Sequence, residues 1–350
     1  MAIYSDDEYY PYSAALEVTL ACNMKCIHCG SYADGRNRAN PLTKQEWLKV
    51  IDDLKTLKTK LFTLSGGEPF LYPHWRELLS HIKSEGDTYS EASIITNGSK
   101  INEDDVVFMK KHNLVNLAIS LDGTRDVHDT IRRTKGSFDM VMGVIDLCHK
   151  HNVLVSIATS VNQYNYDCIK DLLDILLQKK AQVWQFQIVN SFGRAGEHKS
   201  RMIISRDQYK KLIDDMALLR GQHKDQIKIF AADSIGYCHP VTNSFLDDTE
   251  WLGCSAGLFN IGIESNGTVK GCLSLQQPQF NAGNVRERSL IDIWKDDDAF
   301  AYTRKYDAKK MTGACKACEA NEQCKAGCIA MAYSINNTLY ENNYCYKLLT

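Results

Sequence analysis

The sequence predicts an α/β fold of repeated strand–helix units, followed by a smaller cysteine-rich appendage. In the first half of the chain, short apolar runs that end in small polar residues recur at intervals of roughly 25 to 30 residues. Segments with helical periodicity lie between these runs. Beyond residue 253 the cysteines become frequent. A chain of 350 residues is long enough for one large domain and such an appendage.

The individual elements can be placed along the chain. Helical periodicity is clear over residues 45–57 and 164–177, and Thr43 with Glu46 three residues later forms a capping-box pattern before the first of these helices. Glycines and charges interrupt the pattern around residues 190–200, and a bridging helix is predicted near 206–219. Strands are predicted near residues 14–20, 60–65, 92–96, 115–121, 153–160 and 182–189.

Composition and charge exclude several classes of protein. The formal net charge of −2 provides no electrostatic surface for a general nucleic-acid binder. No apolar run approaches the ~20 residues of a membrane span, and the acidic N-terminus lacks the features of a signal peptide. Thirteen cysteines without an export signal indicate a reducing compartment and metal ligation instead of disulfides. We therefore expect a cytoplasmic protein that binds neither nucleic acid nor membrane.

Three cysteines near the N-terminus form the most informative motif. Cys22, Cys26 and Cys29 have C-x3-C-x2-C spacing directly after the first predicted strand. Three thiolates on one loop can hold three corners of a cubic iron–sulfur cluster and leave one iron with an open position. Such an iron can bind and reduce a ligand. The alternatives are a structural zinc site or buried thiols.

Polar residues also follow the next predicted strands. Gly66-Gly67-Glu68-Pro69 ends the second strand, Asn97-Gly98 the third, and Ser120 with Asp122-Gly123 the fourth. Taken singly, these are turn dipeptides or an acid at a helix start. They become informative because they follow the cysteine loop in sequence, one after each successive predicted strand.

This ordered set resembles the radical S-adenosylmethionine (SAM) enzymes. The resemblance implies a partial (β/α)6 TIM-like barrel with its site at the C-terminal ends of the strands. It implies that the cysteine loop binds a [4Fe–4S] cluster whose fourth iron is chelated by SAM. One electron, from a reductant such as flavodoxin or ferredoxin, would then split SAM to a 5′-deoxyadenosyl radical that abstracts hydrogen from the substrate.

The resemblance also implies which residues contact SAM. The run Gly66, Gly67, Glu68 and Pro69 matches the element that meets the methionyl amino group. Glycines let backbone carbonyls approach closely, and a carboxylate complements an ammonium.

Five further residues complete the expected SAM site. His28 stands where the family usually has an aromatic residue against the adenine. Asn97, Ser120 and Asp122 resemble positions that meet the ribose or the carboxylate of SAM. Arg132 is a further candidate for that carboxylate.

A second cysteine constellation lies near the C-terminus. Its C-x2-C-x5-C-x3-C…C pattern, with two more cysteines upstream, resembles the SPASM extension, which binds two auxiliary [4Fe–4S] clusters. Three clusters in total are therefore expected. A pair of zinc knuckles is the rival interpretation, because C-x2-C turns also suit tetrahedral zinc.

The family pattern implies two ligand sets. The outer set is Cys315, Cys318, Cys324 and Cys345, and the inner set is Cys254, Cys272 and Cys328. No second cysteine follows Cys254 closely, so the inner cluster has an open iron or takes Cys238 as a fourth ligand, unless Cys238 is an ordinary thiol. An open iron could bind substrate, whereas a closed cluster would relay electrons. Cys148 and Cys168 are predicted to be small buried hydrophobes inside helices.

The same resemblance divides the chain and suggests its substrate. We expect a core barrel over residues 1–200, a bridging region over 201–252 and a SPASM domain over 253–350. SPASM enzymes are mostly maturases of peptides. Leu273 follows Cys272, where the sulfatase-maturing branch typically has an aspartate, which argues against that branch.

A ribosomally made peptide is the expected substrate, and a crosslink or similar oxidation the expected product. Few residues precede the first strand, so we expect either a separate leader-recognition protein as a partner or another way of recognising the substrate. Chemistry on a small molecule, such as a tetrapyrrole or sugar intermediate, is the alternative, and a scaffold without chemistry is a third. Asp233, Tyr237 and His239 either line the substrate cavity or are structural.

Overall fold

A computed structural model describes residues 9–33, 38–232, 234–235, 237 and 251–349. Within these ranges ten strands form one sheet in the order β10-β9-β8-β1-β2-β3-β4-β5-β6-β7. The strands are β1 (Ser13–Thr19), β2 (Leu61–Gly66), β3 (Glu91–Thr96), β4 (Asn116–Ser120), β5 (Val155–Val161), β6 (Val183–Ile188), β7 (Lys228–Ala231), β8 (Asn260–Ile263), β9 (Thr268–Lys270) and β10 (Gly283–Asn284).

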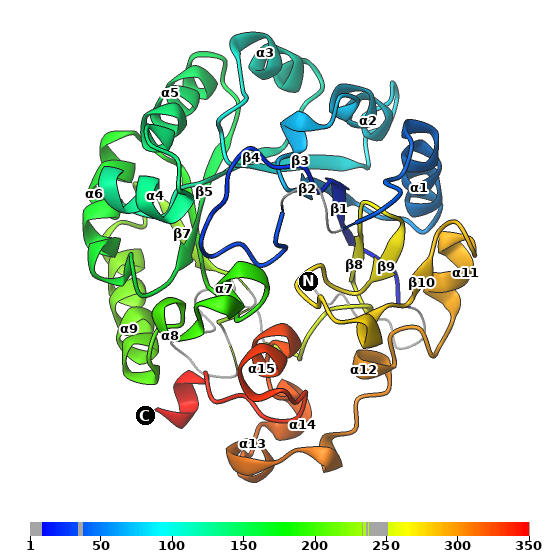
Figure 1. Ribbon diagram of the computed structural model, residues 1–350, viewed down its shortest axis with the longest axis vertical. Helices are drawn as coiled ribbons and strands as arrows, with labels where there is room; N and C mark the ends of the chain where they lie inside the picture. The colour runs from blue at the N-terminus through cyan, green and yellow to red at the C-terminus, as the bar shows by residue number, and fades with distance from the viewer. Residues whose placement is uncertain (1–8, 34–37, 233, 236, 238–250, 350) are drawn as a thin grey trace.

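The sheet is a curved, open half-barrel with helices outside it (Figure 1). Strands β1 to β7 pair in parallel with their neighbours, and β8 also runs parallel to β1. β9 and β10 are antiparallel additions at one edge. The predicted partial barrel is therefore confirmed, and it does not close.

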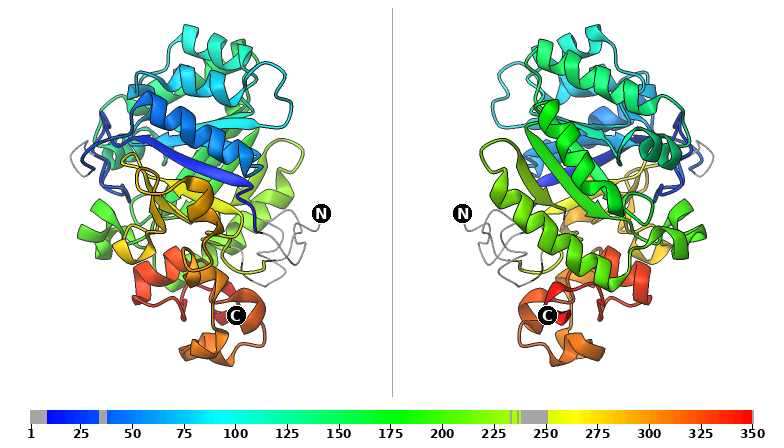
Figure 2. Two further views of the ribbon diagram at one scale, coloured as in Figure 1. Left: turned by 90° about the vertical axis from the view of Figure 1, so that its right-hand side faces the viewer. Right: turned by 90° about the vertical axis from the view of Figure 1, so that its left-hand side faces the viewer.

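Helices follow most strands, as expected for parallel pairing. Figures 1 and 2 show α1 to α6 and α9 around the outside of the sheet and α13 to α15 grouped below it. The helices are α1 (Lys44–Thr56), α2 (Trp75–Ile82), α3 (Glu103–Lys111), α4 (Arg125–Arg132), α5 (Ser137–Lys150), α6 (Ile169–Gln178), α7 (Gly193–Glu197), α8 (Lys199–Met202), α9 (Arg206–Gln222), α11 (Leu290–Lys295), α12 (Ala301–Arg304), α13 (Gly313–Ala317), α14 (Asn321–Cys324) and α15 (Ile329–Asn336).

The six predicted strands coincide closely with β1 to β6, and the capping box of Thr43 and Glu46 is formed. The helix predicted over 164–177 begins later, at Ile169. The reason is the Asn165 side chain, which donates hydrogen bonds to the carbonyls of Asp122, at 2.8 Å, and Ser160, at 3.0 Å. These bonds hold the preceding residues in a turn.

Cys148 and Cys168, which belong to no expected ligand set, differ in how deeply they are buried. Cys148 is fully buried in α5, as predicted. Cys168 was expected inside a helix, but it lies in the 3-10 turn before α6 and is only half-buried. No disulfide joins any of the cysteines that the structure describes.

The core lies between the sheet and its helices, where Trp47, Phe62, Trp184 and Phe186 are completely buried. The sheet continues from the N-terminal strands into β8, which belongs to the cysteine-rich region. The division at residues 200 and 252 stays a prediction. Within the described ranges, no helix has the length and apolar character that crossing a bilayer requires.

Glu46 also ties α1 to the C-terminal region, and this generates a stability prediction. Its carboxylate accepts hydrogen bonds from Arg286 Nε, at 2.6 Å, and Arg286 Nη2, at 2.9 Å. The pair is partly exposed, so Glu46→Gln should lower the free energy of unfolding at pH 7 by about 0.5 to 1 kcal/mol.

The same pair should make the effect of Glu46→Gln depend on pH. Arg286, and then the N–H of Thr43, lower the pKa of Glu46 from 4.5 to about 2. Because the folded pKa is the lower one, the stabilisation is complete above pH 4.5 and is lost as the pH falls toward 2. Denaturant unfolding of both proteins at pH 7 and pH 3 should show a shrinking difference; a constant difference would contradict the assignment.

Candidate active site

One cavity of about 810 Å³ reaches from the C-terminal ends of the strands to the N-terminal end of β8. Its wall includes the strand-end residues Ser65, Thr96, Ser120, Ser160 and Gln187. Six cysteines from both expected constellations also line it: Cys22, Cys26, Cys29, Cys254, Cys272 and Cys328. The fold therefore brings the N-terminal motif and the inner set of cysteines to one space.

The three loop sulfurs receive hydrogen bonds of the kind that thiolate ligands need. Met24 N–H donates to Cys22 Sγ at 3.4 Å, and Ala33 N–H donates to Cys29 Sγ at 3.4 Å. Donors of this kind stabilise sulfur in its anionic, metal-binding form. The loop thus fits a cluster, which would supply the open iron and the electron for SAM cleavage.

Burial opposes ionisation of these thiols. It raises the pKa of Cys22 to about 11 and also raises that of Cys26. The guanidinium of Arg132 opposes the effect at Cys26, because its Nη1 donates to Cys26 Sγ at 3.8 Å. Iron must therefore displace protons when it binds.

The loop is held from outside by α7, in a segment where sequence reasoning found only a broken pattern. Arg194 Nε donates to the Cys26 carbonyl at 2.8 Å, and Arg194 N–H donates to the Cys29 carbonyl at 3.0 Å. Ile27 N–H also donates to the Ile131 carbonyl at 2.9 Å. Arg194 thus positions the cysteine loop, a role that no sequence motif predicted.

Gly66, the last residue of β2, and Gly67 lie against the backbone that leads into the cysteine loop. Gly67 N–H donates to the Thr19 carbonyl at 2.8 Å. A Cβ on Gly66 would lie 2.1 Å from Thr19 O, and one on Gly67 would lie 2.3 Å from Ala21 O. The glycines line the cavity as expected, but their close approach is to this chain's own backbone.

Glu68 and Pro69 are both buried, and neither is part of the cavity wall. The Glu68 carboxylate accepts hydrogen bonds from Thr96 Oγ1 and from Asn97 N–H, each at 2.8 Å, and from Phe70 N–H at 3.2 Å. Glu68 therefore fixes the end of β3 from behind the cavity wall.

Asp122 also lies behind the wall and not in it. It is fully buried, and Arg132 Nε donates to its Oδ2 at 2.7 Å. Ser160 N–H donates to its Oδ1 at 3.0 Å. With both oxygens engaged, Asp122 positions Arg132, which lines the cavity, whereas Asp122 itself is not part of the wall. The contacts of both residues with SAM stay predictions.

His28, Asn97 and Ser120 line the cavity where they were expected. Burial lowers the pKa of His28 to about 4, so its ring is neutral at pH 7, and its Nε2 lies 3.3 Å from Asp122 Oδ2. A neutral, buried ring can pack against a flat aromatic base. Asn97 is oriented by Asn23, whose Oδ1 accepts from its Nδ2 at 3.2 Å.

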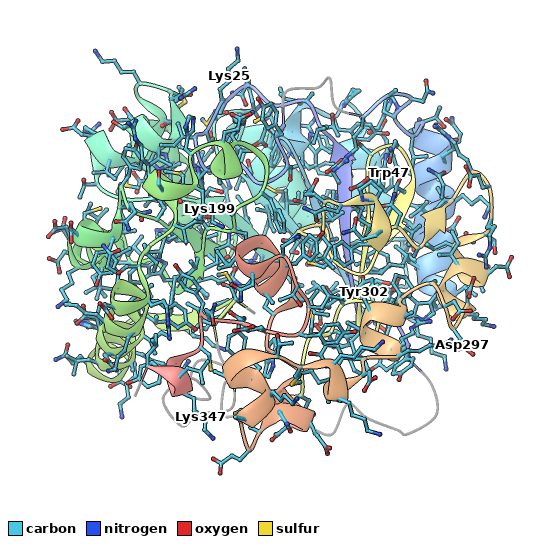
Figure 3. The ribbon with its side chains drawn as sticks, turned by 60° about the horizontal axis from the view of Figure 1, so that its bottom comes forward. Lys25, Trp47, Lys199, Asp297, Tyr302 and Lys347 are labelled. Atoms are coloured by element: carbon cyan, nitrogen blue, oxygen red, sulfur yellow. The ribbon has the colours of Figure 1, made fainter. Side chains whose placement is uncertain are left out.

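The C-terminal cysteines form two neighbourhoods. Tyr302, on α12 (Figure 3), is partly buried near Cys254 and Cys272, and its hydroxyl accepts a hydrogen bond from Gly271 N–H at 3.1 Å. In the outer set, Asn342 N–H donates to Cys315 Sγ at 3.4 Å.

The outer cysteines are also close enough to affect one another. Burial first, and then the nearby Cys315 and Cys318, raise the pKa of Cys345 to about 11. Among the described residues, no three His, Cys, Asp or Glu side chains are already arranged around a single metal ion. The cluster assignment therefore depends on motif spacing, the shared cavity and the donors to sulfur.

Three residues just before the cysteine-rich region were considered for the cavity wall. Tyr237 is buried among protein groups and does not line the cavity. Asp233, Cys238 and His239 lie outside the described residues. For the inner cluster, an open iron and a fourth ligand from Cys238 therefore both stay predicted alternatives.

A buried ion network at the cavity wall was not predicted. Glu17, on β1, lines the cavity, and Arg38 Nε donates to its Oε1 at 2.6 Å. Arg38 Nη2 lies 3.0 Å from Glu264 Oε1, and so does Lys270 Nζ. This network joins the segment after the cysteine loop to the strands that carry Cys272.

Comparison with known proteins agrees with this geometry. Residues 16–176 match the radical SAM superfamily. Residues 254–319 match SPASM, an iron–sulfur cluster-binding domain. The chain belongs to the radical SAM superfamily. More particularly, it is a radical SAM enzyme with a C-terminal SPASM domain.

Its curated relatives have different activities. An AdoMet-dependent heme synthase from Methanosarcina barkeri is 26% identical over 349 residues, which is 96% of both chains. The sporulation killing factor maturation protein SkfB of Bacillus subtilis is 27% identical over 82% of this chain and 65% of SkfB. The mycofactocin maturase MftC of Mycobacterium tuberculosis is 26% identical over 92% of this chain and 79% of MftC.

Solved structures share the fold. SuiB of Streptococcus suis bound to S-adenosylmethionine has a TM-score of 0.75 and 17% identity over 96% of this chain and 77% of SuiB. Native anSMEcpe with bound AdoMet has a TM-score of 0.76 and 19% identity over 96% of this chain and 94% of its own. SuiB has also been solved with its precursor peptide SuiA.

The contact of Gly67 with the loop backbone leads to a prediction. Gly67→Ala places a Cβ against Ala21 O and must displace the cysteine loop, so most of the about four irons of a SAM cluster should be lost. Iron and sulfide analysis after anaerobic reconstitution measures this.

Gly143→Ala is the matched control, because a Cβ there meets no atom within 4 Å in the middle of α5. It should keep all the iron and raise the free energy of unfolding by about 0.5 to 1 kcal/mol. Full iron content in Gly67→Ala would show that the loop does not depend on this contact.

Proposed function

We propose that this enzyme generates a 5′-deoxyadenosyl radical and abstracts hydrogen from a ribosomally made peptide, installing a crosslink or similar oxidation. The observation that carries the proposal is the single cavity shared by the loop cysteines and the inner cysteines. A substrate held there would lie beside both the SAM-cleaving centre and an auxiliary cluster.

The wall of the cavity suits a peptide. It carries many neutral side-chain hydroxyls and amides, which can pair with backbone N–H and C=O groups. The amides include Gln185, Gln187, Asn190 and Asn260. Of the cationic side chains that line it, Arg132 is paired with Asp122, and Arg194 donates to the Cys26 carbonyl. A carboxylate-rich tetrapyrrole would find both arginines of the described wall already engaged.

The ligands of the clusters belong to this proposal. Three [4Fe–4S] clusters would be held by the loop cysteines, by the inner set and by the outer set as assigned above. SAM would lie between the cysteine loop and the strand ends, against His28, Asn97, Ser120 and Arg132, with Gly66 and Gly67 beside its amino group. A one-electron reductant such as flavodoxin or ferredoxin, and a separate leader-recognition protein, complete the proposed partners.

A second candidate function is chemistry on an iron tetrapyrrole. It is favoured by one observation, namely that the heme synthase of Methanosarcina barkeri matches this chain over 96% of both lengths. The relatives SkfB and MftC are peptide maturases by name and are about equally identical. A substrate assay must therefore compare both classes directly.

The test incubates reduced, reconstituted enzyme and SAM with either the precursor peptide encoded beside its gene or Fe-coproporphyrin III. We expect 5′-deoxyadenosine and a loss of about 2 Da from the peptide, since one crosslink removes two hydrogens. Mass spectrometry and chromatography measure both products.

The Cys22/Cys26/Cys29→Ala variant is the control and should make no 5′-deoxyadenosine. Turnover of the tetrapyrrole with no change in any neighbouring peptide would overturn the peptide proposal and support the second candidate. Failure of the wild type to cleave SAM under any condition would contradict the enzyme assignment itself.

A further inference from the structure

Tyr209, on α9, has a buried hydroxyl that the chemistry described so far does not use. The side chain is 0% exposed, and among the described residues its hydroxyl has no hydrogen-bond partner. An unpaired buried hydroxyl destabilises the folded state, because it has lost its hydrogen bonds to water. Native structures rarely keep such a group without a ligand, water or ion to satisfy it.

The surroundings of Tyr209 identify the missing partner. Its ring packs edge-on against Tyr344, with ring centroids 5.4 Å apart, and Tyr344 directly precedes Cys345. The Tyr344 hydroxyl donates to the Ile204 carbonyl at 2.5 Å, just before α9, and the Tyr346 hydroxyl bonds to Asp214 on α9. These two contacts hold the Cys345 segment against the helix that carries Tyr209.

Three of the expected cluster ligands lie near Tyr209. Cys345, Cys324 and Cys328 are close enough to interact with it electrostatically. Cys345 also directly follows Tyr344, whose ring packs against Tyr209. Sulfur of a cluster held at these cysteines is therefore an available acceptor for the unpaired hydroxyl.

We propose that the Tyr209 hydroxyl donates an O–H···S hydrogen bond to the auxiliary cluster held by the outer cysteines. This rests on the ligand assignment in the proposed function. Hydrogen bonds to cluster sulfur stabilise the more negative, reduced state and so raise the reduction potential. Tyr209 is then a positioning and tuning residue that sets how readily the outer cluster accepts an electron.

Tyr237 offers a matched control close to the same cysteines. It is also buried, but its hydroxyl donates to the Ser234 carbonyl at 3.1 Å and accepts from Asn342 Nδ2 at 3.1 Å. Its hydroxyl is thus occupied by protein groups, which also include the backbone of Cys328, a member of the inner set. Tyr237→Phe deletes the same atom without removing a donor to the outer cluster.

The main experiment is a redox titration followed by electron paramagnetic resonance on the reconstituted holoprotein. The Cys22/Cys26/Cys29→Ala background leaves the two auxiliary clusters as the only signals. Tyr209→Phe should lower the midpoint potential of the outer cluster with iron content unchanged, and Tyr237→Phe should leave the potential of that cluster unshifted. An unshifted potential in fully loaded Tyr209→Phe overturns the proposal.

Thermal unfolding of the cluster-free chain keeps the proposal testable if Tyr209→Phe loads poorly. In that state Tyr209→Phe loses no hydrogen bond and should match or exceed the wild-type Tm, whereas Tyr237→Phe should fall below it. An equal fall in both variants would show that Tyr209 has a protein partner and would overturn the proposal. A wild type that never binds two auxiliary clusters would instead overturn the ligand assignment.

Discussion

The architecture of the site depends on the close contact between two backbone segments, the end of β2 and the exit of β1. Gly66 and Gly67 allow this contact, because any side chain there would overlap the carbonyls of Thr19 and Ala21. The contact fixes where the chain leaves β1 and hence where Cys22 begins the loop. Arg194 then anchors the loop from the opposite side.

The second half of the cavity is built on the same sheet as the first. β8 pairs with β1 in parallel and β9 runs antiparallel to β8, so Cys254 and Cys272 lie beside the N-terminal ends of β1 and β8. They line the cavity at the end opposite to the cysteine loop, which follows the C-terminal end of β1. The buried pair of Glu17 and Arg38 reinforces this junction, and Glu17 also accepts a hydrogen bond from Ser265 N–H at 3.1 Å. Replacing either residue of such a pair by a neutral one leaves the other charge uncompensated, which strongly destabilises the folded state. One sheet therefore fixes the positions of the loop cysteines and the inner cysteines relative to each other.

Much of this could be predicted from the sequence, because strand periodicity and motif order are local properties. The strands β1 to β6, the capping box at Thr43 and the placement of the cysteine loop at strand ends all followed from them. Sequence spacing could not tell which polar side chains at strand ends face the cavity. Glu68 and Asp122 are examples, because hydrogen bonds from Asn97 N–H and Ser160 N–H hold their carboxylates behind the cavity wall.

The most direct test of the account is the iron and acid-labile sulfide bound per chain after anaerobic reconstitution, with the Cys22/Cys26/Cys29→Ala variant beside the wild type. Three [4Fe–4S] clusters predict about twelve irons in the wild type and about eight in the variant, because one four-iron cluster is lost. About four irons in the wild type, with zinc bound at the C-terminal cysteines, would contradict the account. The chain would then be a single SAM-cleaving centre on a zinc-stabilised protein.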